Sequence, residues 1–194
     1  MKKIAIYGGT FDPVHHAHLI LAREAAEVLD LDSVLFVPAA QSPHKLHETP
    51  ARADDRLAML RAATANEPLF SVEDVELMRP PPSFAIDTVE TIRGRNEAEV
   101  IFFLVGSDNI DALPTWHRWV ELRTLVTFVA LERTGVGSDC GYQTISRRVD
   151  ISATDIRNRV ASGRSIRYLV PPAVEEIIRN RQLYQKAPRS VPKT

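Results

Sequence analysis

The stretch “KKIAIYGGTFDPVHHAHLILAREAAEVLDL”, residues 2–31, predicts the first strand and helix of a pattern that recurs along the rest of the chain. Its apolar run, residues 4–7, ends at Gly8 and Gly9, a pattern that predicts a buried strand leading into a tight turn. The segment from residue 18 to residue 31 predicts an amphipathic helix, because its apolar residues recur at helical spacing. These residues are Leu19, Ala22, Ala26 and Leu29. A strand, a turn and a helix in this order begin an alternating α/β pattern.

The same alternation continues along the chain. Further strands are predicted at 33–38, 69–74, 99–106, 125–133 and 143–151, the last as a polar edge strand. Further helices are predicted at 51–66, 83–94, 152–163 and 171–184. Because most strands are continuous apolar runs, we expect an open, doubly wound α/β fold with a parallel sheet and helices on both faces. We expect one domain over residues 1–184 and a frayed tail over 185–194.

Composition and charge narrow the functional class. The chain has 194 residues, of which 44% are hydrophobic and 25% charged, and a formal net charge of −1. This balance argues against a nucleic-acid coating protein and against a polybasic membrane binder, but allows a small anionic ligand. The single Cys140 cannot form an internal disulfide, and the N-terminal apolar run is too short for a signal peptide or a membrane span. We therefore expect a globular cytoplasmic protein, and a homo-oligomer is compatible with this composition.

The turn at Gly8 and Gly9 carries the first candidate site. The two glycines allow the backbone to approach a ligand closely, and His15 and His18, three residues apart, share one face of the helix start. A helix N-terminus attracts anions, and two imidazoles would add charge that changes near neutral pH. This predicts a phosphate site. Incidental histidines beside a capped turn and a zinc site are the alternatives, although no ligand set of cysteines or carboxylates accompanies the histidines.

A second candidate site is “ISATDIR”, residues 151–157. Ser152 and Asp155 match a capping box, which by itself is a structural signal. The same helix start also carries the hydroxyl of Thr154 and the guanidinium of Arg157. Hydroxyls, free amides and arginine together suit a polyphosphate.

Other polar groups follow predicted strands, where ligands bind in open α/β sheets. Lys45 lies in “SPHK”, residues 42–45, and is either a ligand or a solvated lysine. Gly106 and Asp108 follow the most hydrophobic strand. Trp116 comes shortly afterwards, either as core packing or as a stacking surface for a planar ring.

These motifs together resemble a known family. “GGTFDPVHHAH” and “ISATDIR” are similar to the two signatures of the nucleotidyltransferase superfamily. “GSDNIDALPTWHRW”, “LERTG” and “SIRYLVPPAVEEIIRNRQLY” look more narrowly like bacterial nicotinate-nucleotide adenylyltransferases, and the resemblance runs from Ile4 to about Tyr184. It implies a Rossmann-like fold. It also implies transfer of AMP from ATP to nicotinic acid mononucleotide, which gives deamido-NAD and pyrophosphate in NAD biosynthesis.

The resemblance also implies roles for individual residues. Contacts to ATP are expected from Gly8, Gly9, Thr10, Phe11, His15, His18, Gly106, Asp108, Ser152, Thr154 and Arg157. Contacts to the mononucleotide are expected from Lys45, Ala85, Trp116, His117 and Arg133. Within these sets, His15, His18, Lys45 and Arg157 are the expected catalytic residues. Mg²⁺ would be carried mainly by the ATP phosphates, and no metal site built from protein ligands is expected.

Two positions depart from the family pattern. Ala17 stands where glycine is usual, a small change that we expect to be tolerated. Phe84 and Ala85 stand where the family more often has tyrosine and threonine, so a side-chain hydrogen bond from position 85 to the pyridine carboxylate is impossible. Backbone N–H groups at Ala85 and His117 could still hold it, and this pocket sets the choice between acid and amide. Phosphopantetheine adenylyltransferase and a nucleotide-sensing module without turnover remain the alternatives.

Overall fold

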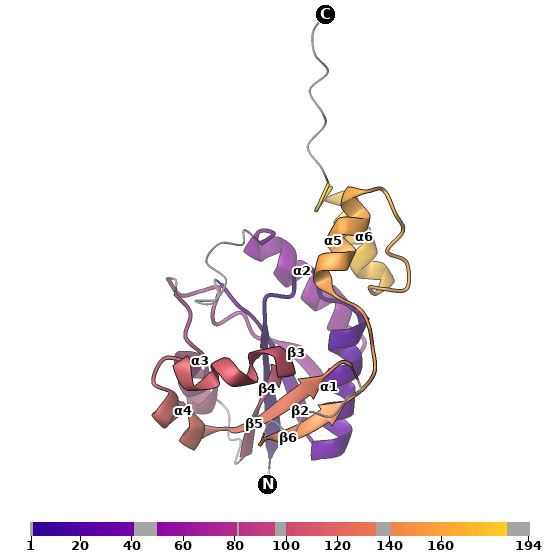
Figure 1. Cartoon of the computed structure of the whole chain (residues 1–194). Helices are drawn as coiled ribbons and strands as arrows, with labels where there is room; N and C mark the ends of the chain where they lie inside the picture. Colours follow the sequence, from indigo (N-terminus) through magenta and orange to yellow (C-terminus); the bar gives the residue numbers. More distant parts are fainter. Residues whose placement is uncertain (1, 41–49, 81, 96–99, 135–140, 186–194) are drawn as a thin grey trace, which may run out of the picture.

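The computed structural model describes residues 2–40, 50–80, 82–95, 100–134 and 141–185 (Figure 1). Within them, six strands form one parallel sheet. The strands are β1 (Lys3–Gly9), β2 (Ser33–Pro38), β3 (Phe70–Val72), β4 (Val100–Gly106), β5 (Thr127–Glu132) and β6 (Gln143–Ser146). Their order is β3-β2-β1-β4-β5-β6. The chain winds from β1 to one edge and restarts beside β1 at β4, so the topological switch point lies between β1 and β4.

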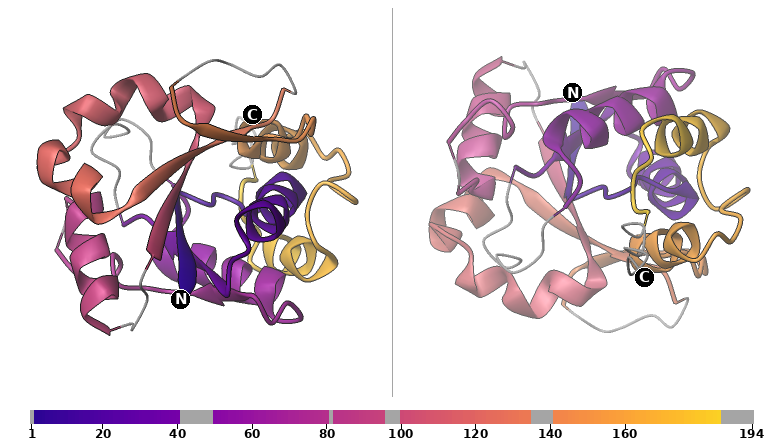
Figure 2. Two further views of the ribbon diagram at one scale, coloured as in Figure 1. Left: turned by 90° about the horizontal axis from the view of Figure 1, so that it is seen from below. Right: turned by 90° about the horizontal axis from the view of Figure 1, so that it is seen from above.

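Alternate strand residues belong to two hydrophobic cores. Helices lie on both sides of the sheet (Figure 2). In β1, Ala5 and Tyr7 belong to the first core, and Ile4 and Ile6 belong to the second. The first core is covered by α1 (His16–Leu29), α2 (Ala53–Thr64), α5 (Ala153–Ala161) and α6 (Pro172–Asn180). The second is covered by α3 (Ala85–Arg95), the 3₁₀-helix η1 (Ser107–Thr115) and α4 (Trp119–Leu125). The predicted doubly wound α/β architecture is confirmed.

The segment between β4 and β5 differs from the prediction: it forms η1 and α4, and the sequence pattern predicts neither element. Pro114 lies inside η1, and α4 has only seven residues, so neither shows an apolar repeat over several turns. Arg118 attaches α4 to α3 by donating to Glu90 at 2.8 Å and to Glu121 at 2.6 Å. β6 lies at the sheet edge as predicted, but it is shorter than the predicted span of 143–151.

The last two helices lie beyond the carboxyl ends of the strands, and α6 packs against α2 (Figure 1). This arrangement brings the C-terminal part of the described chain next to the turn after β1. None of the helices in the described part of the chain is long and apolar enough to cross a membrane. Lys45 and residues 186–194 of the predicted tail lie outside the described residues.

Candidate active site

The turn after β1 is shaped by a close contact between its own residues. A Cβ at Gly9 would lie 3.0 Å from the ring of Phe11. Phe11 has a left-handed backbone with φ of 49°, and its buried ring lies edge-on to Tyr7 and His18 at centroid distances of 5.5 and 5.1 Å. Glycine at position 9 therefore makes room for the Phe11 ring, which in turn supports His18.

His15 and His18 form a stacked pair at the start of α1. Their ring centroids are 3.7 Å apart, with an angle of 26° between the planes. The backbone N–H of His15 donates to Nδ1 of His18 at 3.2 Å. Because Nδ1 accepts this bond, the neutral His18 ring carries its proton on Nε2, which makes Nε2 a hydrogen-bond donor.

The charge state of this pair differs from the sequence-based expectation. Burial of the ring, with the nearby charge of Arg133 and the influence of His16, lowers the pKa of His15 to about 3. Burial also lowers the pKa of His18 well below its usual value, with further contributions from His15 and Arg133. The expectation of a charge that changes near neutral pH is therefore wrong for the ligand-free protein. Its two imidazoles are neutral at pH 7, because burial disfavours the charged form.

This pKa shift predicts acid-sensitive stability. The unfolded chain takes up a proton on His15 below pH 6.5, whereas the folded chain does so only near pH 3. Stability is therefore full above pH 6.5 and falls as pH drops, by about 1.4 kcal/mol per pH unit for one histidine. Between pH 6 and 4.5, wild type should lose roughly 4–8 °C more in melting temperature than His15→Asn. Equal losses measured by circular dichroism would contradict the neutral buried state; the matched control His16→Asn should follow wild type.

The second motif forms the start of α5. Ser152 is the N-cap, and its Oγ accepts the backbone N–H of Asp155 at 3.1 Å, so the Ser152 half of the predicted capping box is confirmed. Arg157 donates from Nη2 to Oγ1 of Thr154 at 3.3 Å and from Nη1 to the carbonyl oxygen of Asp12 at 2.7 Å. The helix start and the turn after β1 are therefore joined through Arg157, although 145 residues separate Asp12 and Arg157 in the sequence.

Both motifs line one cavity of about 340 Å³, which we call the histidine cavity. It contains every residue for which an ATP contact is expected: Gly8, Gly9, Thr10, Phe11, His15, His18, Gly106, Asp108, Ser152, Thr154 and Arg157. Arg133, for which a mononucleotide contact is expected, also lines this cavity. A Cβ at position 106 would collide with the Asp108 carboxylate, so a larger residue there would require the Asp108 side chain to move.

A second cavity of about 420 Å³, which we call the tryptophan cavity, adjoins the first. The two share Gly8, Gly9, Thr10, Gly106 and Asn109 as lining residues. The tryptophan cavity contains Ala85, Trp116 and His117, three of the five residues expected to contact the mononucleotide. The ring of Phe84 contacts that of His117, with centroids 4.3 Å apart and an angle of 31° between the planes. Ala85 is the first residue of α3, so the N-terminus of that helix also lies at this cavity.

Three charged residues near the site were missed by the sequence reading. Arg56 is 1% exposed and donates to the carbonyl oxygens of Thr10 at 2.8 Å and Ala51 at 3.1 Å. Asp12 and Glu76 are also buried; Asp12 lines the histidine cavity and Glu76 lines the tryptophan cavity. Arg56 lies in an amphipathic helix, where an arginine is normally solvated, so the sequence pattern contains no signal for its burial.

The carboxylates of the site are dispersed. Among the described residues, no group of three or more His, Cys, Asp or Glu side chains is placed to hold a metal ion. His15 and His18 are stacked, and Nδ1 of His18 already accepts a backbone N–H. This geometry suits hydrogen bonding to an anion better than convergence of both rings on zinc.

The sheet is open and parallel, and two helix starts, imidazoles and arginines gather at its switch point. This arrangement defines an α/β protein that binds nucleotides through their phosphates.

The cytidylyltransferase-like family model matches residues 6–159. A “Probable nicotinate-nucleotide adenylyltransferase” of Geobacillus thermodenitrificans is 42% identical over 187 residues, which cover 95% of this chain and 87% of the relative. A relative of the same name from Halalkalibacterium halodurans is 44% identical over 191 residues, with 95% and 92% covered. The chain belongs to the nicotinate-nucleotide adenylyltransferase family of nucleotidyltransferases, which are enzymes of NAD biosynthesis.

Solved structures share the fold. Nicotinic acid mononucleotide adenylyltransferase of Plasmodium falciparum, complexed with NaAD, has a TM-score of 0.80 to this chain at 20% identity, with 95% of this chain and 98% of the other covered. The same Plasmodium enzyme complexed with APC has a TM-score of 0.74 at 19% identity, with the same coverage of both chains. The doubly wound fold of this chain is therefore shared with an enzyme whose sequence is only about one-fifth identical.

Proposed function

We propose that this protein transfers AMP from ATP to nicotinic acid mononucleotide and releases deamido-NAD and pyrophosphate. The observation that supports this most directly is the pair of adjoining cavities at the switch point. The histidine cavity offers two helix starts, hydroxyls and arginines, which suit a triphosphate. The tryptophan cavity offers aromatic rings and a helix N-terminus, which suit a planar ring bearing a carboxylate. Two substrates placed in these cavities would meet at their shared wall.

The chemistry we propose is in-line attack by the mononucleotide phosphate on the α-phosphorus of ATP, without a covalent intermediate. The attacking oxygen is already an anion, so no general base is needed. The protein then acts by bringing two anions together and by offsetting the charge that develops on the α-phosphate and the leaving pyrophosphate. Arg133 and Arg157 supply positive charge, and Nε2–H of His18 supplies a hydrogen bond to a phosphate oxygen. Lys45 is included in this proposal from the family motif alone.

Bound phosphates would also change the histidine pair. A polyanion beside a buried neutral imidazole raises its pKa, so nucleotide binding favours proton uptake at His15 or His18. Each ring would therefore either donate a hydrogen bond from its neutral form or take up a proton from solvent when the nucleotide binds. Mg²⁺ would be held mainly by phosphate oxygens and water, and its charge would help neutralise the pyrophosphate. A cytoplasmic location is consistent with this chemistry.

The preference for acid over amide depends on the N-terminus of α3. The first N–H groups of a helix lack acceptors within the helix, and they can donate to a carboxylate. A carboxamide presents its own N–H donors as well, and the N–H groups at the start of a helix cannot accept them. We therefore expect kcat/KM for nicotinic acid mononucleotide to exceed that for nicotinamide mononucleotide by about tenfold or more. Pyrophosphate release with each substrate measures this ratio.

Ala85→Pro tests the backbone donor itself. Proline is favoured at the first position of a helix and has no N–H, so the variant removes one donor while keeping the helix. It should lower kcat/KM for the acid and leave the amide nearly unchanged, whereas the control Ala85→Gly keeps the N–H, adds no hydroxyl and should keep the wild-type ratio. The proposed function would be overturned if the protein used phosphopantetheine as the acceptor in place of a pyridine mononucleotide. It would also be overturned if none of these acceptors gave turnover.

A further inference from the structure

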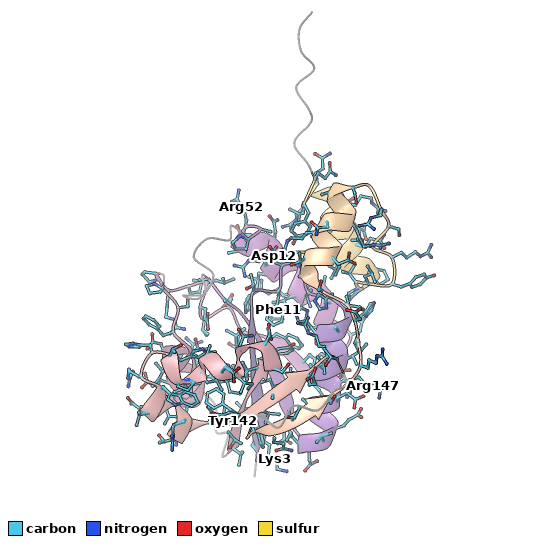
Figure 3. All side chains as sticks on the ribbon, in the orientation of Figure 1. Lys3, Phe11, Asp12, Arg52, Tyr142 and Arg147 are labelled. Atoms are coloured by element: carbon cyan, nitrogen blue, oxygen red, sulfur yellow. The ribbon has the colours of Figure 1, made fainter. Side chains whose placement is uncertain are left out.

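A buried carboxylate that lines the histidine cavity, that of Asp12, is hydrogen-bonded to the C-terminal end of the described chain. Asp12 is 8% exposed and lies in the turn after β1, beside α5 (Figure 3). Its Oδ1 accepts the backbone N–H of Ala51 at 3.2 Å and the hydroxyl of Tyr184 at 2.7 Å. Its other oxygen, Oδ2, lies 4.0 Å from Nη1 of Arg157. Asp12 therefore contacts three segments that are far apart in the sequence.

The distance between Asp12 and Arg157 is long for a charge pair. A tight arginine–carboxylate pair has N–O distances of about 2.7–2.9 Å and is often bidentate. Here Nη1 of Arg157 instead donates to the Asp12 carbonyl oxygen at 2.7 Å, and the guanidinium lines the histidine cavity. Arg157 is thus held beside Asp12 without forming a tight ion pair with the Asp12 carboxylate.

Tyr184 is placed to keep Asp12 in this orientation. The segment that carries it is attached to α2, because Arg181 pairs with Asp55 at 2.6 Å. Burial and the adjacent Asp12 carboxylate raise the pKa of the Tyr184 hydroxyl, so it remains protonated and donates at neutral pH. With the phenol and an amide both donating to Oδ1, rotation of the carboxylate toward Arg157 would break two hydrogen bonds.

We propose that Tyr184 is a positioning residue for ATP: by holding the Asp12 carboxylate, it leaves the Arg157 guanidinium available to the triphosphate. This inference rests on the proposed function for the identity of the ligand. Without the phenol donor, the carboxylate is freer to turn toward Arg157, and it then competes with phosphate oxygens for the same N–H groups. The C-terminal end of the described chain thereby takes part in the site formed by the turn after β1.

Tyr184→Phe removes only the donor. We expect the Kd for ATP, measured by titration calorimetry, to rise about five- to tenfold, the size of a partly lost contact to a charged group. KM for the mononucleotide should stay within about twofold, because Arg157, through which Tyr184 is proposed to act, lines the histidine cavity and not the tryptophan cavity. Tyr168→Phe is the matched control: Tyr168 is 78% exposed and packs against Arg167, so this variant should bind ATP as wild type does.

A second substitution separates positioning from stability. In the Tyr184→Phe background, Asp12→Asn should bring the Kd for ATP back toward the wild-type value, because a neutral amide does not compete with phosphate for Arg157. A purely structural role predicts the opposite, with the double variant weaker than Tyr184→Phe alone and lower in melting temperature. That result, or an unchanged Kd in Tyr184→Phe, would overturn the inference. If wild type binds ATP but releases no pyrophosphate with the mononucleotide, the proposed function fails, and the Kd comparison still tests Tyr184.

Discussion

His18→Ala should lower kcat by about 100-fold or more while changing the Kd for ATP by less than about threefold. His18 lies against Phe11 and His15, and its neutral ring presents Nε2–H as a donor. Removing one donor aimed at charge that develops during the reaction typically costs about 10²–10³ in kcat. In the proposed complex, the ground-state triphosphate keeps its contacts from Arg157 and the two helix starts, so we expect its affinity to change little.

Single-turnover kinetics and titration calorimetry separate the two quantities. His16→Ala is the matched control, because His16 lies between the two cavity histidines in the sequence but lines neither cavity. If His18→Ala weakens ATP binding by the same factor as it lowers kcat, His18 binds the ground state and transition state equally, and its catalytic role is wrong.

Trp116→Ala should raise KM for the mononucleotide about 10- to 100-fold and leave the Kd for ATP nearly unchanged. Trp116 lines the tryptophan cavity and packs edge-on against Phe103 and Phe128 at centroid distances of 5.7 and 6.2 Å. Stacking of an aromatic side chain on a base is worth about 1–3 kcal/mol by alanine substitution, which sets the expected range. Trp116→Phe should retain much of the affinity, since a ring remains.

Loss of core packing would also result from this substitution, so a control is needed. Trp119 packs against Phe128 at 5.1 Å but lines neither cavity. Trp119→Ala should lower the melting temperature without a specific effect on KM for the mononucleotide. Trp116 would be a core-packing residue and not a stacking surface if Trp116→Ala and Trp119→Ala had the same effect on KM for the mononucleotide. The same conclusion would follow if Trp116→Ala weakened ATP binding as much as mononucleotide binding.

The fold was predictable because its signals are local. The apolar runs of β1, β2 and β4 and the helical spacing in α1 can be read from neighbouring residues. The short elements between β4 and β5 were missed, because η1 and α4 lack a repeated apolar face. The order of the strands is also a tertiary property, since every parallel connection needs a crossover whose direction no local pattern contains.

The candidate site likewise has features that local sequence predicts and features that only long-range packing determines. The sequence by itself determined the doubly wound class and the residues with phosphate chemistry, because glycine turns, helix starts and paired motifs are local. Only the tertiary structure decided that those residues line one cavity, that Arg133 joins them, and that Arg56, Asp12 and Glu76 are buried nearby. It also decided that His15 is neutral, since a pKa depends on burial and on charges distant in sequence. Long-range packing creates desolvation and brings Tyr184 to Asp12, and neither effect is present in a local stretch of chain.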